Sequence, residues 1–182
     1  MNISQQELTF TGCALLCASV ASFHDVRDRR IPNVLSGPAI VAGLAIHAAV
    51  GGWSGLGDSA FAGLVAGAVS LVFWIVGGMG AGDVKLMAAV GCITGFFPLQ
   101  MVLISTAITG GLFALGLSVY HGRLRETLHN VVVLAAHHRR RGLEQHPDLN
   151  LQSPRTISLP FALPIAAGCL VTLCALAWEA RS

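Results

Sequence analysis

Long apolar segments, separated by short polar ones, constrain the fold of this 182-residue chain more than any other feature. A helix needs about 20 consecutive apolar residues to cross a bilayer. Six segments approach that length, at about 8–23, 34–50, 59–76, 83–98, 99–120 and 159–178. Charged residues make up only 11% of the chain, against about 25% in soluble domains. We therefore expect an all-α, polytopic membrane protein with about six transmembrane helices.

The basic residues are sorted to one side of this arrangement. No positive charge precedes the first apolar segment, so no cleavable signal peptide is evident and the first helix is expected to begin outside. Ten of the eleven Lys and Arg residues then fall in the polar segments 24–33, 77–85 and 121–158. The eleventh, Arg181, follows the last apolar segment. The positive-inside rule makes these three segments cytoplasmic and places both termini outside.

No boundary between soluble domains is visible, and we expect residues 1–182 to form a single membrane-embedded domain. Its one long polar segment is a cytoplasmic loop at about 121–158, rich in Arg and His. Apolar residues continue at helical spacing from Arg123 to Ala136, so we expect the preceding helix to extend into this loop.

The cysteines and histidines do not predict a metal site or a cofactor. The five cysteines lie in apolar segments and form no Cys-x-x-Cys pair, which is typical of small packing residues. The histidines of the long loop have no cysteine or carboxylate ligands clustered with them. They are His121, His129, His137, His138 and His146. His47, inside the second apolar segment, is expected to bond another helix, and His24 to lie at the membrane interface.

Two aspartates lie at the ends of apolar segments, where a charge is costly and often functional. Asp25 precedes a basic run, and Asp83 follows a glycine-rich one; the predicted topology brings both to the cytoplasmic side. Each also has a simpler explanation. Asp25, with Asp28, would balance neighbouring arginines, and Asp83 would cap a helix N-terminus. Lys85 would hold an acidic group of a substrate or face lipid phosphates.

The order of these motifs resembles a known family. Asp25 is followed six residues later by Ile31-Pro32-Asn33, and Asp83 stands in Gly80-Ala81-Gly82-Asp83-Val84-Lys85-Leu86. This pattern resembles the prepilin peptidases of type IV pilus and related secretion systems, which are GxGD-type intramembrane aspartyl proteases. Leu159-Pro160-Phe161-Ala162 resembles the family's C-terminal pattern. The resemblance implies that Asp25 and Asp83 are catalytic. It implies supporting or substrate-binding roles for Gly80, Gly82, Lys85, Ile31, Pro32, Asn33 and Pro160.

The same resemblance implies a function and its partners. The expected activity is removal of the leader peptide from prepilins or pseudopilins at the cytoplasmic face of the bacterial inner membrane, without metal or cofactor. The partners would be the prepilin, membrane lipids and pilus assembly proteins, but no nucleic acid. Longer family members carry an N-terminal Cys-x-x-Cys extension associated with N-methylation. This sequence begins at the first core helix and resembles the short form of tight-adherence (Flp-type) pilus systems, which leaves methylation open.

Two other functions fit the same features. A small transporter or channel also uses intramembrane carboxylates and glycine-broken helices, but it usually shows an inverted repeat, and residues 99–182 do not repeat the glycine-rich turn. An inactive scaffold of a pilus assembly complex is the third possibility. Cleavage of a co-expressed prepilin would separate all three.

Overall fold

The computed structural model describes residues 5–28, 31–141 and 160–181, and this part of the chain contains six helices and no strand. The helices are α1 (Gln5–Asp28), α2 (Asn33–Ile75), α3 (Ala81–Thr94), α4 (Phe96–Tyr120), α5 (Leu124–Arg141) and α6 (Ala162–Glu179). Four of them, α1, α2, α4 and α6, are long and apolar enough to cross a membrane. The prediction of an all-α polytopic membrane protein is therefore confirmed.

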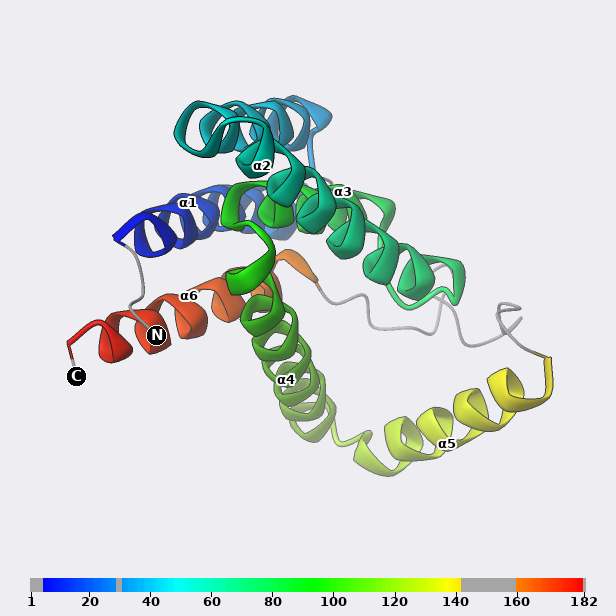
Figure 1. The fold of residues 1–182 in the computed structure, drawn as a ribbon. Helices are drawn as coiled ribbons and strands as arrows, with labels where there is room; N and C mark the ends of the chain where they lie inside the picture. The colour runs from blue at the N-terminus through cyan, green and yellow to red at the C-terminus, as the bar shows by residue number, and fades with distance from the viewer. Residues whose placement is uncertain (1–4, 29–30, 142–159, 182) are drawn as a thin grey trace.

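Helix α2 contains two of the predicted segments, because it reverses direction near its middle. Gly52 has φ +61° and ψ −142°, a conformation that L side chains rarely adopt. Beyond it the chain folds back (Figure 1), and a side chain added at Gly55 would collide with the carbonyl oxygen of His47. The two arms of α2 correspond to the predicted segments at 34–50 and 59–76.

Helix α3 is shorter than the predicted fourth span and lies inside the bundle. Its 14 residues reach about 21 Å, less than the roughly 30 Å hydrocarbon core. From Leu86 to Thr94 every residue except Ala88 is buried. The helix ends before Gly95, because this residue has φ +75° and leaves the helical conformation. Pro98 does not end a helix, since it fits the first turn of α4 without losing a hydrogen bond.

Small residues allow α2 to approach α3 closely and α1 to pack against α3 and α6. Ala14, Ala18 and Ala21 on α1 are fully buried in a core that α3 and α6 share. Across α2, the backbone of α3 is so near that a methyl group on Gly43 would lie 2.7 Å from the carbonyl carbon of Cys92. Such contacts are typical of helix packing in membranes.

The expected continuation of the helix ending at Tyr120 into the polar segment is wrong. Gly122 has φ +67° and separates α4 from α5, which begins at Leu124. The periodicity that suggested continuation belongs to this separate helix. Residues 142–158 of the predicted loop lie outside the described part of the chain. The cytoplasmic location of the whole segment 121–158 stays a prediction.

Candidate functional site

The ends of four helices converge on Asp25 and Asp83, which we call the aspartate pair. Asp25 lies in the last turn of α1, and Asp83 in the first turn of α3. The N–H of Ala162, the first residue of α6, donates a hydrogen bond to Oδ2 of Asp25 at 3.3 Å. Because α1 and α6 run antiparallel side by side (Figure 1), residues 137 apart in sequence meet there.

Asp83 is buried, with only 7% of its surface exposed, and its two carboxyl oxygens differ. Oδ2 accepts a hydrogen bond from the Gly80 N–H at 3.2 Å, so the capping role expected of an acidic residue is real. Oδ1 is also buried but has no hydrogen-bond partner among the described residues. Capping explains one oxygen, and the second oxygen remains for another interaction.

Burial and a neighbouring charge change the acidity of Asp83. Desolvation, followed by the negative charge of Asp25, raises the pKa of Asp83 from 3.8 to about 7, against the opposing hydrogen bond from Gly80. The two carboxyl groups are therefore close enough to influence each other. Near neutral pH a substantial fraction of Asp83 carries its proton.

The surroundings of Asp25 favour its ionised form more than those of Asp83 do. Its side chain is only partly buried. Its hydrogen-bond donor, the Ala162 N–H, lies at the N-terminus of α6, where the helix dipole and free N–H groups favour an anion. The pair thus combines a deeply buried carboxyl group with one that is better solvated and accepts a main-chain hydrogen bond.

The Ile31-Pro32-Asn33 segment lies against the first turn of α3. Lys85 donates a hydrogen bond from Nζ to Oδ1 of Asn33 at 2.8 Å. A methyl group on Gly82 would lie 3.2 Å from Cβ of Ile31, so the glycine permits this close packing. Pro32 precedes α2 in an extended conformation, and its carbonyl accepts the Leu35 N–H at 3.0 Å.

The remaining predicted site residues take up related positions. A methyl group on Gly80 would lie 2.9 Å from Oδ2 of Asp83, so glycine there allows the carboxyl group to fold back on the chain. The carbonyl of Pro160 accepts the Leu163 N–H at 3.2 Å and helps to start α6, whose first N–H reaches Asp25. Leu159 lies outside the described residues.

Asp28 differs from the aspartate pair in its surroundings. It is exposed, and its Oδ2 lies 3.7 Å from Nδ1 of His24, one turn earlier on α1. In the described part of the chain, no group of three or more His, Cys, Asp or Glu residues is arranged to hold a metal ion.

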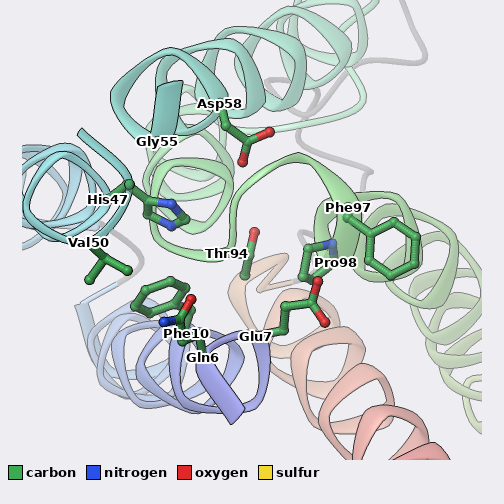
Figure 2. Close-up of a pocket in the computed structure, with 11 residues that line it drawn as sticks. Gln6, Glu7, Phe10, His47, Val50, Gly55, Asp58, Thr94, Phe97 and Pro98 are labelled. Carbon is green, nitrogen blue, oxygen red and sulfur yellow. The ribbon is translucent and has the colours of Figure 1, made fainter. Parts of the chain in front are cut away.

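A second polar cluster, which the sequence did not single out, lies at the opposite end of α1 (Figure 2). His47 bonds the Ile93 carbonyl at 3.0 Å through Nε2, which confirms the expected bond to another helix. Asp58 accepts the Phe96 N–H at 3.1 Å. Both side chains line a pocket of about 330 Å³. These two hydrogen bonds connect the two arms of α2 to the turn between α3 and α4, at the end of the bundle opposite Asp25.

The hydrogen bond from the Ala162 N–H to Asp25 was not predicted from the sequence either. A main-chain donor leaves no side-chain pattern in a sequence. The only available signal was the position of Leu159-Pro160-Phe161-Ala162 at the start of the last apolar segment.

Comparison with known proteins identifies the family of this chain. A sequence model described as the Type IV leader peptidase family matches residues 12–115, which include Asp25, Asp83 and the motifs around them. A prepilin leader peptidase/N-methyltransferase of Aeromonas salmonicida is 36% identical over 104 residues, covering 53% of this chain and 35% of that protein. The protein of the same name from Aeromonas hydrophila is 35% identical over 104 residues, which again cover 53% of this chain and 35% of that protein.

The chain thus matches only about a third of the length of these relatives. No solved structure matches it significantly. The family match nevertheless extends over more than half of the chain and contains both members of the aspartate pair. On this evidence, the chain belongs to the Type IV leader peptidase family.

Proposed function

We propose that this protein is an intramembrane aspartyl endopeptidase that removes the leader peptide of prepilins or pseudopilins. The main support is the state of Asp83, a buried carboxyl group near the charge of Asp25, one oxygen of which has no hydrogen-bond partner in the described part of the chain. Paired carboxyl groups with different surroundings can divide acid and base roles between them. The family match and the names of the relatives give the class of substrate.

The unequal surroundings assign a role to each aspartate. Asp25, ionised and held by the Ala162 N–H, takes a proton from water as general base. Asp83, protonated, donates from Oδ1 to the oxygen of the scissile carbonyl as the water oxygen attacks the carbonyl carbon. Asp25 then gives its proton to the leaving nitrogen, and as the C–N bond breaks a hydroxyl group of the gem-diol intermediate returns a proton to Asp83 and becomes the carbonyl of the new carboxyl terminus. No covalent intermediate forms with the enzyme.

The supporting residues hold this arrangement. Gly80 and Gly82 bring the start of α3 close to its neighbours, and Ile31, Pro32 and Asn33 join α1 to α2 beside it. These residues, with Lys85 and Pro160, form the border of the site. The peptide segment of the substrate would bind along this border, because the ends of four helices meet there.

We place this site at the cytoplasmic face of the bacterial inner membrane, with both termini outside. The support is the sorting of ten of eleven basic residues into segments on one side. A basic leader would then remain in the cytoplasm while the hydrophobic stretch of the prepilin lies in the bilayer. Reporter fusions after Gly52 and Ser182 should report the outer side, and fusions after Arg30 and Arg141 the cytoplasm. A cytoplasmic C-terminus would overturn this orientation.

Cleavage of a co-expressed prepilin tests the function directly. The chain and the double variant Asp25→Asn, Asp83→Asn are expressed at matched membrane levels, and the mature N-terminus of the pilin is identified by mass spectrometry. Removal of the leader by the unaltered chain alone supports the proposal. An uncleaved pilin that still assembles would indicate a scaffold. Mass spectrometry also shows whether the new terminus is methylated.

A further inference from the structure

Helix α5 has an apolar face that is exposed in the described structure. Leu124, Leu128, Val131 and Val132 recur at helical spacing, so they form one stripe along the helix. Between 37% and 67% of the surface of each is exposed. We call these four residues the apolar stripe. Among the described residues α5 packs mainly against the end of α4, so its four aligned aliphatic side chains require a covering surface.

The rest of α5 is polar and basic. Arg125, Glu126 and His129 are exposed beside or opposite the apolar stripe, and the helix sequence ends in three consecutive arginines at 139–141. Among the six helices, α5 has the strongest separation of apolar and polar faces and a low overall hydrophobicity. This combination is typical of helices that lie in the plane of a membrane surface.

The start of α5 is fixed to the end of α4, a candidate membrane span. The Arg123 N–H bonds the Ser118 carbonyl at 2.9 Å and the Gly122 N–H bonds the Val119 carbonyl at 3.0 Å, which together form a Schellman motif. The Ser118 hydroxyl also bonds the Thr127 hydroxyl at 2.6 Å. The corner is therefore a defined turn, and α5 points away from α4 and apart from the other helices (Figure 1).

We propose that α5 binds the surface of an anionic phospholipid bilayer on the side where α4 ends. The apolar stripe would enter the boundary between headgroups and acyl chains, and the excess of basic residues in the helix sequence would favour anionic headgroups over neutral ones. Two observations select this partner. Only three residues separate α5 from the end of a membrane span, and the helix sequence carries four arginines and one glutamate. Basic segments next to a membrane span are attracted to anionic lipids.

Hydrogen exchange of the full chain in liposomes tests this inference. The protein is reconstituted in phosphatidylcholine alone and in a mixture with phosphatidylglycerol, and exchange is followed over residues 124–134. We expect exchange to be slower in the anionic mixture. Leu128→Glu, on the apolar stripe, should increase the exchange rate by about tenfold or more, since full burial of a leucine contributes about 1.5–3 kcal/mol. His129→Glu, which adds the same side chain on the polar face, should change it much less.

A second measurement does not depend on how Leu128→Glu folds. Val131→Trp and His129→Trp each add one tryptophan to the three of the natural chain. Brominated lipid should quench the additional emission of Val131→Trp much more than that of His129→Trp. Equal quenching of the two, equal exchange in both lipid mixtures, or exchange that depends on protein density in the bilayer would each overturn the inference. The last result would show that a second protein copy covers the stripe.

Discussion

Lys85 on α3 donates a hydrogen bond from Nζ to Oδ1 of Asn33 at the start of α2, with 2.8 Å between the two atoms. The two residues are 52 positions apart. Each is near a member of the aspartate pair in sequence, so this bond links the connection after Asp25 to the turn that carries Asp83. Lys85 thus has a structural role inside the protein that neither of its sequence-based interpretations included.

We predict that Lys85→Met and Asn33→Ala lower prepilin cleavage to a similar extent, and that the double variant is no worse than either single one. The reason is that each change removes the same bond, so the effects should not add. Cleavage time courses at matched membrane levels measure this coupling. Arg27→Met, which removes an exposed positive charge from the end of α1, is the control and should keep most of the activity. Fully additive losses would show that Lys85 acts on the substrate independently.

The contact between α2 and α3 predicts different effects of two glycine substitutions on the same arm of α2. A methyl group on Gly43 would lie 2.7–2.8 Å from backbone atoms of Cys92 and Ile93, whereas nothing lies within 4 Å of one on Gly37. Gly43→Ala should destabilise the protein by about 1–3 kcal/mol, because the backbone of α3 must move. Gly37→Ala should change stability less, because its Cβ meets no other helix and only the neighbouring ring of Pro38 opposes the gain in helix propensity. Thermal unfolding in detergent compares them, and equal melting temperatures would contradict the close approach.

The raised pKa of Asp83 predicts a dependence of stability on pH. The pKa of this carboxyl is higher in the folded protein, at about 7, than its usual 3.8, so its contribution to stability is fully present below 3.8 and is lost as pH rises toward 7. Ionisation of Asp83 then costs up to about 4 kcal/mol. Asp83→Asn removes this cost, so the melting temperature of the variant should rise relative to the natural chain between about pH 4 and pH 7.

The same titration should affect catalysis. If Asp83 must carry its proton to act as the acid, prepilin cleavage should decline as pH rises through about 7.

Both predictions depend on the titration of Asp83. A melting-temperature difference between Asp83→Asn and the natural chain that does not change with pH would show that Asp83 does not titrate in this range.

Much of the fold could be predicted because the bilayer requires long apolar helices. Length and hydrophobicity identified every segment that became α1, α2, α4 or α6. The details that failed depend on single residues whose effect is local. Gly122 separates α4 from α5 through its positive φ, and Pro98 is accommodated within the first turn of α4. Periodicity alone carries no information about such turns.

The candidate site could be predicted only as a set of motifs. The side chains of Asp25 and Asp83 are visible in the sequence, but the properties that distinguish them arise from packing. The buried, unpartnered Oδ1 of Asp83 and the main-chain bond from Ala162 to Asp25 depend on how α1, α3 and α6 meet. A single sequence predicts which carboxylates are candidates, and the assembled helix ends give the two carboxyl groups their unequal surroundings.

The remaining prediction concerns which carboxylates carry out cleavage. Asp25→Asn and Asp83→Asn should each abolish it, because asparagine has nearly the same shape as aspartate but cannot exchange a proton. The double variant should be no worse than either single one, since the pair acts as a unit. Asp28→Asn is the matched control, because Asp28 shares the end of α1 with Asp25 but is exposed and paired with His24.

Asp58→Asn is a second control, at the other end of the bundle. Asparagine keeps an acceptor for the Phe96 N–H, so this variant should cut normally, whereas Asp58→Ala should lose about 1 kcal/mol of stability. A cleavage time course on a prepilin, with membrane levels matched by immunoblot, compares all the variants. If Asp28→Asn were inactive while Asp25→Asn still cut, Asp25 would not be the base. The exposed carboxylate beside His24 would have to take its place, although no described contact holds it near α6.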